Sequence, residues 1–172
     1  MPLRKLKEIP KIPKARKKKP EAIIASVPLK KPDKLEFICK AYFKYDTKLK
    51  KQFTAFLIET NVEFTNFTYE ISVETIHEKN VLYFVITGLL VRMDIVPEIA
   101  PARKEILLDT LTGDYTINVV KQDGAINSAE FHFNIFNKEI KLIKEFIPKK
   151  KNNRFFCKFE VAKEESTFPE SF

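Results

Sequence analysis

The side chains that most often perform chemistry are few in this sequence and lie far apart. Its two histidines and two cysteines show none of the CxxC or HxxxH spacings of metal ligands; they are His77, His132, Cys39 and Cys157. Its three glycines are too widely spaced to build a phosphate-binding loop. No serine has the flanking glycines of a nucleophile elbow. We therefore expect a protein that is not an enzyme and that uses no cofactor or metal ion.

One pair of acids has the spacing of possible catalytic carboxylates. Glu70 and Glu74 fall on one face of an expected strand, where paired carboxylates can serve glycoside hydrolysis. Opposing lysines on neighbouring strands explain such acids more simply. We interpret the two glutamates as part of a solvated strand face.

The positive charge of the chain is concentrated at its N-terminal end. The formal net charge is +8, from 31 basic and 23 acidic side chains. Residues 1–34 hold 12 of the basic and 3 of the acidic side chains, a balance of +9 that leaves 19 − 20 = −1 for the rest. Six of the ten prolines lie in residues 1–33, which favours extended backbone over helix. This segment is predicted to be a basic arm.

The arm combines two features that suit different contacts. Its cations, together with a second basic run expected in a loop, could neutralise phosphates or an acidic protein surface; they are Lys11, Lys14, Arg16, Lys17, Lys18, Lys19, Lys149, Lys150, Lys151 and Arg154. Between the lysines lies an apolar island that could add as a strand to a sheet edge, with Ile23, Ile24, Val27 and Leu29 as docking residues. The alternatives are a soluble tail and an early first strand.

The segments that would carry these surfaces read as strands. EFICKAYFKY and RFFCKFEV alternate apolar and polar residues, and each places a cysteine on the apolar face, where a free thiol acts as a small hydrophobe. A disulfide between the two cysteines is the alternative. NVLYFVITGLLV is apolar almost throughout, as in a central strand covered on both faces. Residues 51–60 and 138–147 fit either strand or helix.

Seven to nine such strands indicate an all-β domain, a sandwich or a barrel. EILLDTLTGDYTINVV resembles the E-to-F corner of immunoglobulin-like and fibronectin-III-like domains. The resemblance implies an antiparallel β-sandwich in which Tyr115 is the corner tyrosine, bonded to the backbone near Leu111. The inter-sheet disulfide and core tryptophan of antibody domains are absent. We expect an arm over 1–33, the sandwich over 34–163 and an acidic tail over 164–172.

Together these features favour a structural protein over a catalyst. The first hypothesis is an accessory subunit of a larger protein or ribonucleoprotein assembly, whose arm looks like those of ribosomal proteins and binds an acidic partner such as RNA. A capsid auxiliary protein whose arm clamps its neighbours is the alternative, and an enzyme or ligand carrier using the domain interior is a remote one. The N-terminus lacks a signal-peptide apolar run, so a cytoplasmic or virion-associated location is expected.

Overall fold

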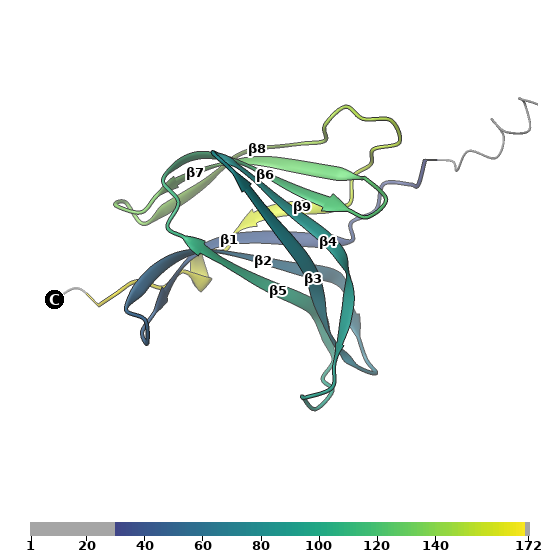
Figure 1. The fold of residues 1–172 in the computed structure, drawn as a ribbon, viewed down its shortest axis with the longest axis horizontal. Coiled ribbons are helices and arrows are strands. Elements are labelled where there is room, and N and C mark those ends of the chain that lie inside the picture. Colours follow the sequence, from purple (N-terminus) through teal and green to yellow (C-terminus); the bar gives the residue numbers. More distant parts are fainter. Residues whose placement is uncertain (1–29, 171–172) are drawn as a thin grey trace, which may run out of the picture.

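The computed structural model describes residues 30–170, and the chain there is built almost entirely from strands (Figure 1). The strands are β1 (Phe37–Asp46), β2 (Lys51–Phe64), β3 (Thr68–Glu78), β4 (Val81–Arg92), β5 (Ala100–Asp109), β6 (Gly113–Lys121), β7 (Ile126–Asn134), β8 (Glu139–Phe146) and β9 (Cys157–Val161), followed by a short 3-10 helix, η1 (Lys163–Glu165). Within this part of the chain, no helix has the length and apolar character needed to cross a membrane.

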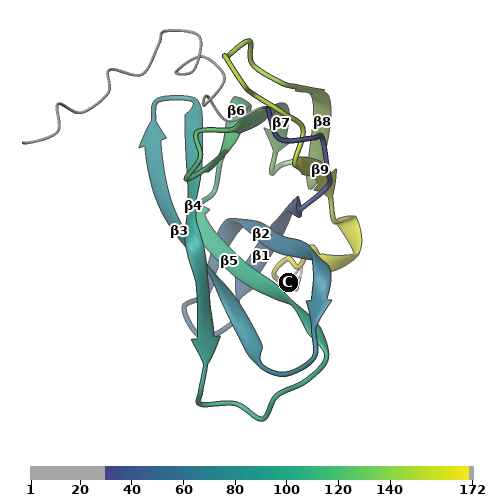
Figure 2. The same ribbon diagram turned by 90° about the vertical axis from the view of Figure 1, so that its right-hand side faces the viewer.

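All nine strands join one continuous sheet, in the order β8-β7-β6-β4-β3-β5-β2-β1-β9. The sheet curls until its two edge strands, β8 and β9, lie close together, so that it is nearly closed into a barrel (Figure 2). We call the line where β8 meets β9 the seam. It includes a hydrogen bond to a side chain, in which the Phe159 amide donates to the Glu145 carboxylate at 2.6 Å.

The all-β class and the expected number of strands are confirmed, but the pairing is not that of an antiparallel sandwich. Strands β1 and β9 pair in parallel, as do β4 and β6, and β3 meets β5 in parallel at one residue pair. The connection over residues 93–99 accounts for the two parallel pairs of β3 and β4, because it carries β5 across to pair with β2. Strand β6 then returns to β4 in the same direction. Alternation along a strand reveals its faces but not its neighbours.

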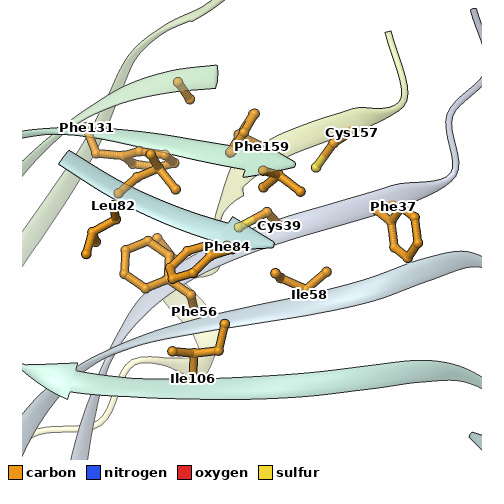
Figure 3. Packing of buried hydrophobic residues seen from close by; sticks show 14 of the residues in the cluster. Phe37, Cys39, Phe56, Ile58, Leu82, Phe84, Ile106, Phe131, Cys157 and Phe159 are labelled. Atoms are coloured by element: carbon orange, nitrogen blue, oxygen red, sulfur yellow. The ribbon is translucent and has the colours of Figure 1, made fainter. Parts of the chain in front are cut away.

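The core lies inside the curl and is dominated by phenylalanine. Strand β1 buries Phe37, Cys39, Ala41 and Phe43 on one face, as its alternation predicts. Around them lie Phe56, Phe84, Phe131 and Phe159 from four other strands (Figure 3). The rings of Phe56 and Phe84 meet with centroids 5.0 Å apart, in a tilted arrangement favourable to aromatic pairs.

Both segments that fitted either strand or helix are strands, β2 and β8. The acidic tail is partly held by the domain, because the Phe168 ring packs on Phe43 and Thr167 hydrogen-bonds along β1. Tyr115 packs edge-on against Phe133, with centroids 5.9 Å apart. Among the described residues, its hydroxyl forms no hydrogen bond to the backbone near Leu111, whose own amide donates to the Thr54 hydroxyl.

Candidate functional site: a basic end and an apolar end

A network of buried charges occupies the end of the molecule where the arm joins the sheet. The Arg154 side chain is only 3% exposed, and its guanidinium donates to Glu36 and to Asp123, each at 3.1 Å. Lys121 reaches the same Glu36 carboxylate at 2.6 Å. Lys31, at the root of the arm, contacts Asp123 at 3.4 Å. The network therefore ties the segment before β1, the end of β6 with the turn that follows it, and the segment before β9 to one another.

The electrostatics of this network keep its carboxylates ionised. Burial raises the pKa of the Asp123 carboxyl, but the Ala125 amide and the Arg154 guanidinium outweigh this effect and bring the pKa to about 2. Burial opposes ionisation of Glu36 as well, yet hydrogen bonds from Lys121 and Arg154 hold its pKa below the usual value. Two carboxylates are thus matched by two internal cations.

Arg154, one of the cations proposed to bind an acidic partner, is consequently engaged inside the protein. Its fork is shared between two carboxylates, and its guanidinium also lies over the Phe156 ring, 5.6 Å from the centroid. The other three cations of the same run, Lys149, Lys150 and Lys151, are exposed. They form a surface that we call the lysine loop.

Asparagine side chains hold the lysine loop in place. Asn153 is 7% exposed and bonds to both backbone groups of Ile126 and to the Pro148 carbonyl. Lys150 donates its ammonium to the Gly124 carbonyl at 2.5 Å. Asn127, on β7, accepts from the amides of Phe156 and Cys157 just beyond the loop. Three lysines are therefore displayed on a fixed segment.

The structure brings the lysine loop to the root of the arm. The Phe155 amide donates to the Asp33 carboxylate at 2.9 Å, and the Lys34 amide donates to the Phe155 carbonyl at 3.2 Å. Exposed Lys30, Lys31 and Lys34 thus lie on the segment attached to the end of the loop. The other predicted arm residues lie outside the described part of the chain: Lys11, Lys14, Arg16, Lys17, Lys18, Lys19, Ile23, Ile24, Val27 and Leu29.

An apolar surface that the sequence did not reveal lies at the other end of the molecule. The β4–β5 connection and the end of β2 expose large aliphatic side chains there, and we call this surface the distal patch: Val62, Met93, Ile95, Val96 and Ile99. Met93 and Val96 are 84% and 80% exposed. Figure 1 shows these connections at the bottom of the view and the root of the arm at the upper right. Four of the five side chains lie within residues 93–99, and exposed apolar surface of this kind commonly marks interaction sites.

The residues considered for chemistry are dispersed over the fold. His132 bonds to Asp114 at 2.6 Å, and His77 contacts the Lys79 carbonyl. Glu70 forms ion pairs with Lys104 and Arg92, as expected of a solvated strand face. Cys39 and Cys157 are both free and buried. Over residues 30–170, no group of three or more histidine, cysteine or acidic side chains is placed to hold a metal ion.

Comparison with protein-family models, with curated proteins and with solved structures gave no match.

Proposed function

We propose that the protein is a non-catalytic accessory subunit of a larger assembly, which binds an acidic partner through its basic end. The observation that carries this proposal is the convergence of the lysine loop with the root of the arm. Residues more than 110 positions apart, Lys34 and Lys149, belong to segments joined by backbone hydrogen bonds. The three exposed lysines of the loop therefore lie near Lys30, Lys31 and Lys34 at the root of the arm.

The acidic partner that suits this surface best is RNA or another nucleic acid. Lysines of the arm and of a fixed loop can contact the phosphates of a nucleic-acid backbone, and such contacts do not read its sequence. Each phosphate they neutralise releases a counterion, so binding weakens steeply as salt rises. An acidic protein surface would bind with a shallower dependence on salt.

The test is binding of a fluorescein-labelled single-stranded RNA to the full chain, measured by anisotropy over a range of salt concentrations. We expect a linear fall of log K with log salt, and a slope reduced by about 1.4 when Lys149 and Lys151 are both replaced by alanine. Lys48 and Lys50, on the β1–β2 turn, give the matched control pair. Salt-insensitive binding, or an equal effect of the control, would show that the basic end is not a phosphate-binding surface.

The distal patch supplies the docking half of the proposal. An apolar surface on a protein subunit of the same assembly would cover it, while the basic end reaches the nucleic acid. Tagged full-length protein recovered from its source and treated with nuclease should keep the partner subunit. The double variant Met93→Asp with Val96→Asp should release that subunit. The control is Leu49→Asp, which should retain it, because Leu49 is also well exposed, at 68%, but lies on the β1–β2 turn.

A further inference from the structure

Strand β4 is paired along its whole length on one side but only along half of it on the other. Residues Val81–Ile86 pair with β6, which ends at Lys121. The remainder of β4 pairs with β3 through Thr68–Ser72 and, among the described residues, has no strand on its second side. The Gln122 side chain donates to the Thr87 carbonyl, just where β6 stops. The free edge therefore runs over residues 88–92.

This edge lacks the features that normally protect exposed strands. Leu89, Leu90 and Val91 are 41%, 57% and 43% exposed, and the stretch from Gly88 contains no proline and no charge before Arg92. A Cβ built on Gly88 would meet no heavy atom within 4 Å, so the edge is open to the close approach of another backbone. The sequence had predicted a strand covered on both faces, and this half of β4 is not.

We propose that the free edge of β4 pairs antiparallel with the same edge of a second copy of this chain. A two-fold axis that pairs residues 88–92 with themselves must pass through Leu90. Leu90 then faces Leu90 of the second copy, Leu89 faces Val91, and Gly88 faces Arg92. Apolar side chains meet apolar side chains at the three central positions, which is the pairing that stabilises antiparallel strands.

The charges near the edge suit a copy of this chain as the partner. Arg92 faces a glycine, and the two arginines lie four residues apart along the strand, about 13 Å, which exceeds the screening length of about 8 Å in physiological salt. The pairing also brings the Asp94 end of the second copy toward a hollow of about 310 Å³, whose charged lining residues are Lys31, Lys121 and Asp123. Asp94 already pairs with Arg92 at 2.7 Å, and Lys31 pairs with Asp123 at 3.4 Å, but the two side chains remain 66% and 67% exposed and their charges are opposite.

A cysteine placed on the two-fold axis tests this register. Leu90→Cys in the full chain should give a disulfide-linked dimer under mild oxidation, because directly opposed residues of an antiparallel pair bring their Cβ atoms to about 5 Å. Met93→Cys is the matched control. Met93 is more exposed than Leu90, so random collisions would favour it, but the proposed register places it opposite Thr87 of the second copy. Equal cross-linking of the two variants would overturn the proposal.

Sedimentation of the uncross-linked protein gives the second measurement. The wild-type chain should be a dimer, and Leu90→Lys should be a monomer with unchanged strand content, because the two lysines would face each other across the axis. Leu107→Lys, on β5 with the same exposure as Leu89, should remain a dimer. A monomeric wild type would overturn the proposal. The free edge of β4 would then be available for pairing with the arm or with a strand of another protein. If Leu90→Lys failed to fold, the cross-linking result would decide.

Discussion

Replacing Arg154 by methionine should destabilise the protein more than any substitution of a surface cation. The side chain is 3% exposed, and its removal leaves Glu36 and Asp123 with one cation each, Lys121 for Glu36 and Lys31 for Asp123. Breaking a buried ion pair by removing one partner costs about 3–5 kcal/mol. Because the two carboxylate side chains are each 31% exposed and water can partly replace the lost guanidinium, we expect the lower end, about 3 kcal/mol.

The assay is urea unfolding followed by far-ultraviolet circular dichroism. With a denaturant dependence of about 2 kcal/mol per molar urea, the loss would lower the unfolding midpoint by about 1.5 M. Arg103→Met is the matched control: its pair with Glu59 spans 2.9 Å but its side chain is 59% exposed, so we expect a loss of about 1 kcal/mol or less. A loss for Arg154→Met no larger than that of the control would refute the stabilising role of the network.

The same network predicts how stability changes in acid. Asp123, with a pKa of about 2, and Glu36 both hold their protons less tightly in the folded protein than in the unfolded chain. Their contribution is therefore complete above about pH 5 and is lost progressively as the pH falls through about 2. The free energy of unfolding of the wild type should fall more over this pH range than that of Arg154→Met. The two proteins should therefore differ less in free energy of unfolding at acid pH than at neutral pH.

Two further predictions concern the seam and the thiols. Glu145→Ala removes the acceptor of the Phe159 amide, so hydrogen exchange at that amide should accelerate by about tenfold, whereas Glu145→Gln, which keeps an acceptor oxygen, should exchange like the wild type. Burial raises the pKa of the Cys39 and Cys157 thiols, so neither should react with a thiol reagent at pH 8 until urea unfolds the chain; rapid labelling of the native protein would contradict their burial.

The sequence predicted which face of a strand is buried better than it predicted which strands pair with each other. The alternation of β1 correctly placed Phe37, Cys39 and Phe43 in the core, because side-chain direction depends only on position within a strand. The parallel pairing of β1 with β9 is a long-range outcome of packing that no local pattern specifies. The apolar run of β4 was equally ambiguous, since Leu90 resembles a core residue until the end of β6 is known.

The candidate site was predictable in part for the same reason. Lys149, Lys150 and Lys151 are exposed, as expected of a basic loop. Arg154 belongs to the same basic stretch of the sequence but is buried. The difference comes from Glu36 and Asp123, which are distant in sequence and meet the guanidinium only after folding. The aromatic residues that follow Arg154 were the one local signal that the chain was about to enter the core.

The pairing of β1 with β9 also bears on how the chain folds. Phe37 and Cys157 are register partners separated by 157 − 37 = 120 positions, so the ladder between them closes a very long loop. Contacts of this kind form late and slow folding, because chain entropy is lost before the contact is made. During synthesis, the edge of β1 that pairs with β9 has no partner strand until β9 has left the ribosome. That interval is when the chain is most open to pairing with a chaperone or with the wrong strand.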